Sequence, residues 1–407
     1  MARPRSWLKL KRVIGPGVVA GGSDNDPAGI VTYTTAGALF GYSLAWVIIA
    51  ITPLMIVLQE MAGRVALVER RGLARIIESY YGFLLAASVV FVLAVANIAT
   101  IAADLAGVAS VLGLTFGISF VYFIVPVTLL ISSIILFEDY KEIRRLLLTL
   151  TFLLVLYVFS AIFARPDWSM VAAGFIPRFQ NSFLFLAAVI GIIGTTISPY
   201  MLFWQASEEV EERHEVVTVK EMETDTVIGM AWSNIIALFI IIAAGATLFQ
   251  NGVIIESVSD LSLALSPVAG HWSYALFTLG IIVSGVLALP VLAGSTAYAV
   301  ADIFRWRQGL NKKVHVARGF YFIITLAMAL GAALAFLPVS PVNFLFYTQI
   351  LNGFLTPFLI GLLLLLTNNR AIMGSRRYLN TPLKNAIAIF SLLIIVSIDI
   401  LLVLSFF

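Results

Sequence analysis

The sequence contains no cysteine, and only 3 of its 407 residues are histidine. The absence of cysteine excludes a disulfide framework, a thiolate metal site and thiol redox chemistry. Charged residues make up only 12% of the chain, against about 25% in a typical soluble domain. Hydrophobic residues make up 61%, and the mean hydropathy is +1.02. This composition indicates a polytopic membrane protein, for which the lipid bilayer is the main surrounding medium.

Long apolar segments dominate the chain, and many of them reach the roughly 20 residues that cross one hydrocarbon core. We predict eleven membrane-spanning helices, at about 13–39, 43–68, 83–112, 116–137, 144–164, 183–204, 226–248, 272–301, 319–337, 342–366 and 383–406. No linker rich in Gly, Ser or Pro divides them. Residues 1–407 are therefore predicted to form one all-α transmembrane domain.

The distribution of Lys and Arg predicts the orientation of these helices. With a cytoplasmic N-terminus, 23 of the 25 basic residues lie on the cytoplasmic side, and only Arg165 and Arg178 lie outside. The positive-inside rule then places the C-terminus outside the cytoplasmic membrane of a prokaryote. The basic stretch MARPRSWLKLKR lacks a small-residue cleavage site and is read as a retained cytoplasmic flank. Because the charges flank the membrane, no nucleic acid is expected as a partner, and no obligate protein partner is evident.

Two predicted helices contain a proline within a polar stretch. The first contains SDNDPAG and the sixth contains GTTISPY. Pro27 and Pro199 each remove a backbone donor, and a broken helix persists in hydrocarbon only where protein, water or a ligand satisfies the freed groups. Paired interruptions in two halves of opposite orientation point to a transporter's substrate site. We therefore predict inverted repeats at about 13–164 and 183–366, with an extra helix at about 383–406.

Asp26 is the centre of the predicted site. Inserting an acid at the bilayer centre costs about 2.5–3.5 kcal/mol, so such residues usually face a cavity and have a partner. None of the 25 basic residues lies at the centre of a predicted helix, so a transported cation is the expected counter-charge. Asp24 is either a second ligand or a vestibule residue nearer the extracellular mouth. Carbonyls freed at the breaks, such as those of Ser23 and Thr195, can point at an ion.

Further polar residues are predicted at membrane depth. Asn97 and Asp104 lie seven residues apart on the third helix, which places them on one helix face. Gln349 and Asn352 lie three residues apart on the tenth helix. Taken singly, each is expected to be an interhelical contact. Taken together with Ser198, they form a set of oxygen donors around the first break that suits a hard divalent cation.

An acidic run follows the sixth helix, at the end where positive charge is otherwise expected. Its members are Glu208, Glu209, Glu211 and Glu212. One interpretation is a solvated helix face; the other is an inner vestibule that concentrates cations or senses cytosolic divalent ions. Asp399, in the eleventh helix, is expected to be structural.

The two broken helices resemble those of the Nramp family of divalent-metal transporters. The family reads DPGN at the first break, where this chain reads DPAG. GTTISPY is similar to the family segment that ends in Met-Pro-His. AADLAG around Asp104 resembles ATDLAE, and YTQ at 347–349 is similar to the segment that supplies a glutamine. These landmarks follow in the same order over essentially the whole chain.

The resemblance implies a LeuT-like fold, a 5+5 inverted repeat with discontinuous helices 1 and 6, and alternating access around a midplane metal site. In the family, the ion is held by the Asp, Asn and Met residues and by carbonyls from both breaks. By position, Asp26 keeps its role, Ser23 and Thr195 offer carbonyls, and Gln349 joins in the occluded state.

Two departures from the family pattern change the expected ion. Gly29 stands where the family has Asn, and Ser198 stands where it has Met. A thioether favours transition metals, whereas a hydroxyl suits Mg²⁺ or Mn²⁺. The smaller residues also leave a wider site, which suits an ion that keeps part of its hydration shell.

Three further departures concern protons. Tyr200 stands where the family has His, and Asn97 and Gly107 replace two acids of the third helix, whereas Asp104 is retained. These features resemble the Nramp-related magnesium transporter branch, which handles Mg²⁺ and Mn²⁺ without proton symport. We expect uptake of Mg²⁺, and also of Mn²⁺, as a partly hydrated ion without proton coupling. The alternative is a proton-coupled Mn²⁺/Fe²⁺ symporter of the main family type.

Other classes of function fit less well. An organic-solute symporter would bring a carboxylate against Asp26, and a non-transporting receptor on this scaffold would be expected to carry appended soluble domains. No cofactor motif and no nucleophile–base pair indicate an enzyme.

Overall fold

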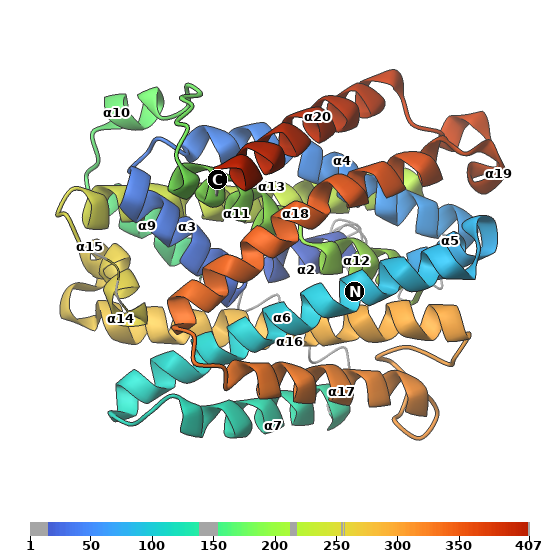
Figure 1. Cartoon of the computed structure of the whole chain (residues 1–407), viewed down its shortest axis with the longest axis horizontal. Coiled ribbons are helices and arrows are strands. Elements are labelled where there is room, and N and C mark those ends of the chain that lie inside the picture. Colours follow the sequence, from blue (N-terminus) through green and yellow to red (C-terminus); the bar gives the residue numbers. More distant parts are fainter. Residues whose placement is uncertain (1–14, 138–153, 212–217, 254, 256, 406–407) are drawn as a thin grey trace, which may run out of the picture.

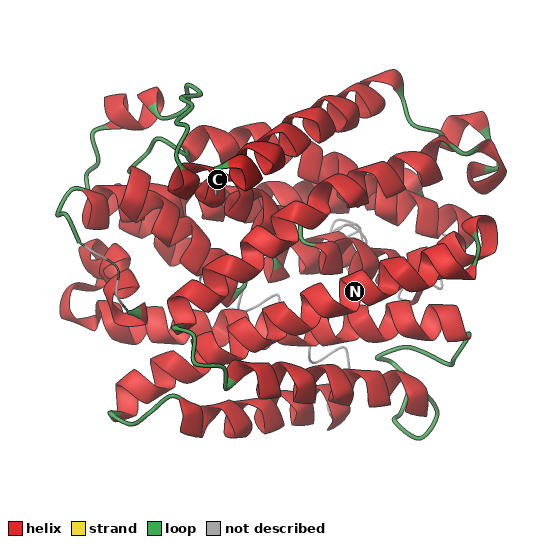
Figure 2. Ribbon diagram, viewed as in Figure 1, coloured by secondary structure: helices red, strands yellow, loops and turns green. Residues whose placement is uncertain are grey.

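The computed structural model describes residues 15–137, 154–211, 218–253, 255 and 257–405. Within these residues the chain is helical and contains no strand, as Figure 2 shows. Eight helical segments in this part are long and apolar enough to cross a membrane. The predicted all-α membrane class is confirmed. The first half of the predicted fifth span, residues 144–153, lies outside the described residues.

The helices occur in the order of the predicted spans, with additional short helices between them. The first part of the chain contains α2 (Pro16–Ser23), α3 (Pro27–Phe40), α4 (Ala45–Glu69), α5 (Leu73–Tyr81), α6 (Phe83–Phe116), α7 (Val121–Phe137), α9 (Val155–Phe163) and α10 (Trp168–Ala173). The middle contains α11 (Phe183–Thr196), α12 (Pro199–Glu211), α13 (Val219–Ala244), the π-helix η2 (Gly245–Phe249), α14 (Val258–Leu261), η3 (Ser262–Leu265), α15 (Ser266–Ala269), η4 (Gly270–Trp272) and α16 (Ser273–Phe304). The last part contains α17 (Arg318–Ala335), α18 (Pro341–Asn368), α19 (Arg370–Met373), η5 (Arg376–Tyr378) and α20 (Pro382–Leu404).

Segments predicted on opposite sides of the membrane occupy opposite ends of the molecule. In Figure 1, α5 and α19 lie at the right end, whereas α10, α14 and α15 lie at the left end. The helices α2, α3, α11 and α12 lie in the interior between these ends. Around them, α6 packs against α16, α17 and α18, and α13 packs against α2, α3 and α4.

The N-terminal half-helix α2 is attached firmly to α13. The Asp225 carboxylate on α13 accepts backbone hydrogen bonds from Gly15 at 2.7 Å, Gly17 at 2.8 Å and Val18 at 3.2 Å. A carboxylate at this position satisfies N–H groups that no helical turn can reach, and the helix dipole favours it. The first turn of α2 is therefore held by a residue far away in the sequence.

The helices α11 and α18 touch through their backbones. A Cβ atom added to Gly194 would lie 1.9 Å from the carbonyl oxygen of Gln349 and 2.3 Å from the backbone nitrogen of Gly353. A Cβ atom added to Gly353 would lie 2.4 Å from the carbonyl oxygen of Ile190. Small residues at such contacts allow close approach where lipid provides no hydrophobic drive for helix association.

This contact predicts a large cost for adding one methyl group. We expect Gly194→Ala to destabilise the protein by about 1–3 kcal/mol, because the backbones of α11 and α18 must separate. Gly361→Ala is the matched control, since Gly361 also lies on α18 but a Cβ atom there meets nothing within 4 Å. The unfolding temperature in detergent measures both variants. Equal unfolding temperatures for the two variants would contradict this account of the contact.

Candidate metal site

The first break separates α2 from α3, and Asp26 lies at its end. The helix α2 ends at Ser23 and α3 begins at Pro27, so three residues between them are not helical. Asp26 is the N-cap of α3, and its carboxylate accepts a hydrogen bond from the backbone N–H of Gly29. Asp followed by Pro is a favoured start for a helix, and the helix N-terminus stabilises the negative charge. The side chain of Asp26 is 1% exposed.

The second break separates α11 from α12. Its freed carbonyl oxygens accept a hydrogen bond from a side chain of the break itself. The single proton of the Ser198 hydroxyl is shared between the carbonyl oxygens of Gly194 at 2.9 Å and Thr195 at 3.0 Å. The Tyr200 hydroxyl donates to the carbonyl oxygen of Ser23 at 3.0 Å. Tyr200, on α12, therefore joins the second break to the first.

The two breaks face each other at Gly29. A Cβ atom on Gly29 would lie 2.8 Å from the Thr195 hydroxyl oxygen, 3.0 Å from Asp26 Oδ1 and 3.1 Å from the Asp24 carbonyl oxygen. One carboxylate, one hydroxyl and one carbonyl oxygen thus converge on the same point. Of the residues predicted for the site, the structure brings Asp24, Asp26, Gly29 and Thr195 together here.

The helix α6 adds a second carboxylate. Asp104 is fully buried, and its Oδ1 accepts a hydrogen bond from the Ala28 N–H at 3.1 Å, so it also binds the start of α3. Its Oδ2 has no hydrogen-bond partner. Asn97, by contrast, donates its amide to the hydroxyls of Ser295 and Thr296 on α16, both at 2.9 Å. The structure places Asp104 at the first break and ties Asn97 to α16.

The helix α18 brings two amides beside the second break. Asn352 donates to Gln349 Oε1 at 3.1 Å and to the Thr100 hydroxyl on α6 at 3.3 Å. Gln349 Nε2 is buried without a hydrogen-bond partner. The backbone of Gln349 contacts α11 at Gly194, next to Thr195. These two amides therefore lie at the junction of α6, α11 and α18.

Asp24 is held by a residue that the sequence did not single out. The Ser233 hydroxyl on α13 donates to Asp24 Oδ2, and the Asn25 amide donates to the same hydroxyl at 2.9 Å.

Tyr33 is a second residue that the sequence analysis did not identify. Its hydroxyl shares a hydrogen bond of 3.0 Å with the hydroxyl of Thr196. Tyr33 lies seven residues after Asp26 on the same helix face, a spacing that could have identified it.

The described residues provide no fixed positive partner for these acids. Their ion pairs join Arg64 and Lys384 to Glu60, Lys384 to Glu223, and Arg305 to Glu78. None reaches Asp24, Asp26 or Asp104. In the same part of the chain, no group of three or more His, Cys, Asp or Glu side chains could hold a metal. A cation at the breaks would therefore depend on a few carboxylate oxygens and on neutral oxygens.

The predicted site residues are closed off from both ends in this arrangement. Each is at most 1% exposed: Ser23, Asp24, Asp26, Asn97, Asp104, Thr195, Ser198, Tyr200, Gln349 and Asn352. The packing around them is polar rather than hydrocarbon-like, because hydroxyl, amide and carboxylate groups from α3, α6, α11, α12 and α18 meet there. These polar side chains are therefore buried together in the interior of the described structure.

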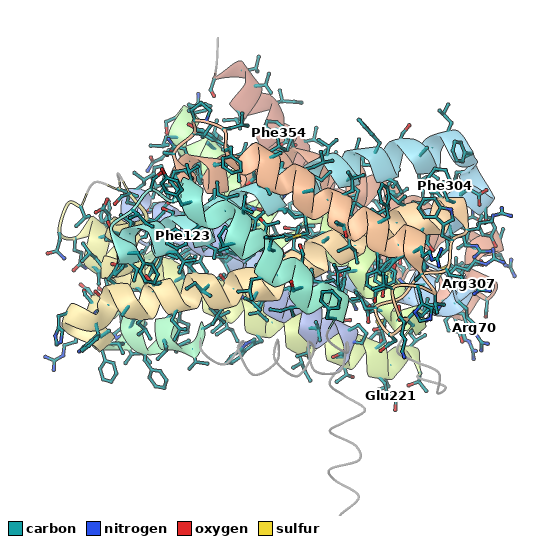
Figure 3. All side chains as sticks on the ribbon, turned by 90° about the horizontal axis from the view of Figure 1, so that it is seen from below. Arg70, Phe123, Glu221, Phe304, Arg307 and Phe354 are labelled. Atoms are coloured by element: carbon teal, nitrogen blue, oxygen red, sulfur yellow. The ribbon has the colours of Figure 1, made fainter. Side chains whose placement is uncertain are left out.

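The acidic run is only partly solvated. Glu208 and Glu209 are buried, so the interpretation as a solvated helix face is wrong for these two residues. The Tyr298 hydroxyl on α16 lies 2.8 Å from Glu208 Oε1 and also bonds Glu211. Glu212 lies outside the described residues. A cavity of about 480 Å³ adjoins this contact and is lined by basic side chains as well as by Glu211. Figure 3 shows one of them, Arg70, at this end of the molecule.

Comparison with known proteins agrees with this geometry. The family profile described as "Natural resistance-associated macrophage protein-like" matches residues 17–405. The divalent metal cation transporter MntH of Deinococcus radiodurans is 29% identical over 392 residues, covering 92% of this chain and 86% of the relative. MntH of Caldanaerobacter subterraneus is 27% identical over 408 residues, covering 94% of this chain and 90% of the relative.

Solved structures show the same fold. A mutant of the manganese transporter of Eremococcus coleocola superposes with a TM-score of 0.77 at 22% identity, covering 98% of this chain and 87% of that one. MHP1, a nucleobase-cation-symport-1 family transporter in a closed conformation, superposes with a TM-score of 0.55 at 15% identity, covering 96% and 89%. The predicted LeuT-like fold is thereby confirmed.

The hydrogen bond between the two breaks predicts a stability effect. We expect Tyr200→Phe to destabilise the protein by about 1–3 kcal/mol, because the buried carbonyl of Ser23 loses its donor. Tyr122→Phe, on a side chain that is 72% exposed, is the control and is expected to change nothing. Thermal unfolding of both variants in one detergent provides the measurement. An unchanged unfolding temperature for Tyr200→Phe would show that this bond does not hold the breaks together.

Proposed function

Since the chain belongs to the Nramp family and is a multi-pass transporter of divalent metal cations, we propose that it imports Mg²⁺ and also Mn²⁺ across the plasma membrane. The observation that carries the proposal is the buried carboxylate of Asp26, which lies between two helix breaks and has no Lys or Arg partner among the described residues. A buried charge without a fixed partner is unfavourable, and a mobile cation relieves that cost.

The donor set supports a hard ion. The side chains around the breaks offer carboxylate, hydroxyl and amide oxygens from Asp26, Thr195, Ser198, Gln349 and Asn352. Mg²⁺ prefers such oxygens and dehydrates reluctantly, so it usually retains several waters in a protein site. Thioether and imidazole ligands, which favour softer metals, are absent from this set. A partly hydrated Mg²⁺ or Mn²⁺ matches these donors.

The proposed import needs no coupling ion. A membrane potential of about 100 mV, negative inside, favours the entry of a divalent cation by about 4.6 kcal/mol, at about 2.3 kcal/mol per charge. Tyr200 contributes a hydroxyl that is bonded to Ser23, and the Asn97 amide is bonded to α16. Asp104 is the one acid of the family's proton route that this chain keeps at the breaks.

The breaks also support alternating access. The proposed inverted repeats cover about 13–164 and 183–366, with an extra helix at 383–406, and the N-terminus is proposed to be cytoplasmic. In that orientation α2 and α12 are the cytoplasmic halves of the broken helices. Rocking of these halves against α6 and α16 would open the occluded site to the cytoplasm.

A proton-coupled Mn²⁺ symporter is the second candidate. It is favoured by Asp104, whose Oδ2 is buried at the start of α3 without a hydrogen-bond partner. The Eremococcus coleocola protein of similar fold is a manganese transporter. Ion selectivity and proton movement therefore have to be measured separately.

Removing the carboxylate tests the proposal. We expect Asp26→Ala to lower kcat/KM for Mg²⁺ and Mn²⁺ uptake into proteoliposomes by at least about 100-fold, equivalent to about 2.7 kcal/mol. Asp399→Asn, which alters an intramembrane acid on α20 outside the breaks, is the control and is expected to retain uptake. If wild-type protein moves neither ion, or if Asp26→Ala moves both normally, the proposal is wrong.

Proton coupling has its own measurement. With a pH dye inside the proteoliposomes, we expect Mn²⁺ uptake to leave internal pH unchanged and to rise with an imposed inside-negative potential. Acidification that depends on both Mn²⁺ and Asp104 would establish the symporter instead. The Asp104→Asn variant distinguishes proton symport from a passive proton leak. Acidification caused by symport should be lost in this variant, whereas acidification caused by a leak should remain.

A further inference from the structure

We propose that the side-chain hydroxyl of Thr195 is the cation ligand from the second break and that, with the space left by Gly29, it determines which divalent ions the site accepts. This inference rests on the proposed function, because it concerns the same site. It differs from the expectation based on family resemblance, in which position 195 contributes only its carbonyl.

The two carbonyls predicted as ligands already have partners. The carbonyl of Thr195 accepts a hydrogen bond from the Ser198 hydroxyl at 3.0 Å. The carbonyl of Ser23 accepts one from the Tyr200 hydroxyl at 3.0 Å. Each oxygen keeps a second lone pair, but a hydrogen bond to the first reduces the electron density it can offer a cation. A backbone carbonyl freed at the second break is therefore already hydrogen-bonded by a side chain of that break.

The Thr195 hydroxyl is in the opposite situation. Thr195 is 1% exposed; its hydroxyl oxygen makes no hydrogen bond of normal geometry, although it lies beside the Tyr33 hydroxyl, which is bonded to Thr196. This oxygen and Asp26 Oδ1 both lie within 3.0 Å of the position that a Cβ atom on Gly29 would take. A buried hydroxyl without a partner is unfavourable. A metal ion, or a water bound to it, would provide the partner while Asp26 provides the charge.

Gly29 makes this arrangement possible. Any side chain at position 29 would begin 2.8 Å from the Thr195 hydroxyl and 3.0 Å from the Asp26 carboxylate, closer than carbon and oxygen normally approach. The three atoms nearest to this position are all oxygens, so glycine keeps carbon away from them. A hydroxyl is a hard, neutral donor that suits Mg²⁺ and Mn²⁺, and it gives soft ions such as Cd²⁺ no advantage.

The adjacent threonine provides a matched comparison. The Thr196 hydroxyl is also buried, but it shares a hydrogen bond of 3.0 Å with Tyr33. Loss of the Thr196 hydroxyl should therefore affect stability, whereas loss of the Thr195 hydroxyl should affect ion binding. A purely structural threonine at position 195 would show the pattern expected for Thr196.

The absence of native cysteine allows a direct test of ligation. We expect Thr195→Cys, in which a soft thiol replaces the hydroxyl, to make Mg²⁺ uptake at least about tenfold more sensitive to Cd²⁺ than in wild type. Thr196→Cys is expected to keep the wild-type sensitivity. In the same proteoliposomes, Thr195→Val should raise the KM for Mg²⁺ about tenfold, and Thr195→Ser should stay within about twofold of wild type. Unfolding temperatures are measured for every variant.

Each outcome decides the matter. Increased Cd²⁺ sensitivity confined to Thr195→Cys, with the KM rescued by serine, supports the inference even if the valine variant proves unstable. Equal Cd²⁺ sensitivity in both cysteine variants and wild type, with normal Mg²⁺ uptake throughout, overturns the inference and leaves the proposed function intact. Wild-type protein that takes up neither Mg²⁺ nor Mn²⁺ overturns the proposed function itself, and the inference with it.

Discussion

The structure depends on the free-energy cost of leaving backbone and carboxylate groups without partners inside the membrane. Two helices are interrupted at that depth, and the interruption at Asp26 also introduces a negative charge. The N-terminus of α3 meets part of the need, because the Gly29 N–H binds Asp26 and the Ala28 N–H binds Asp104. Backbone donors stabilise an anion but do not cancel its charge. The remaining charge makes a mobile cation the natural partner.

The interior packing keeps the two interruptions facing each other. Tyr200 spans them through the carbonyl of Ser23, and Gly194 lets α11 lie directly against α18, which carries Gln349. Neither contact adds a charge. Both reduce the freedom of the oxygen donors, so the geometry at the breaks is fixed before an ion arrives and less ordering remains to oppose binding.

Most of the fold and the position of the first helix break could be predicted from the sequence, because both rest on local signals. Apolar segments long enough to cross a bilayer identify the helices, and Asp followed by Pro inside such a segment marks the break. The orientation of individual side chains could not be predicted in this way. Whether Asp24 binds α13 through Ser233, and whether Glu208 is solvated or lies against Tyr298, depends on which distant helix packs beside it. Sequence spacing within one helix does not contain that information.

The attachment of α2 to α13 determines where the first broken helix can bend. Asp225 accepts three backbone hydrogen bonds from the beginning of α2, so this half-helix and α13 form a rigid pair. Asp24 and Asn25 are also bonded to α13, through Ser233, so the segment that α13 holds extends to the residue before Asp26. An ion bound at Asp26, as proposed, would therefore connect this anchored segment to α3, and its release would separate the two.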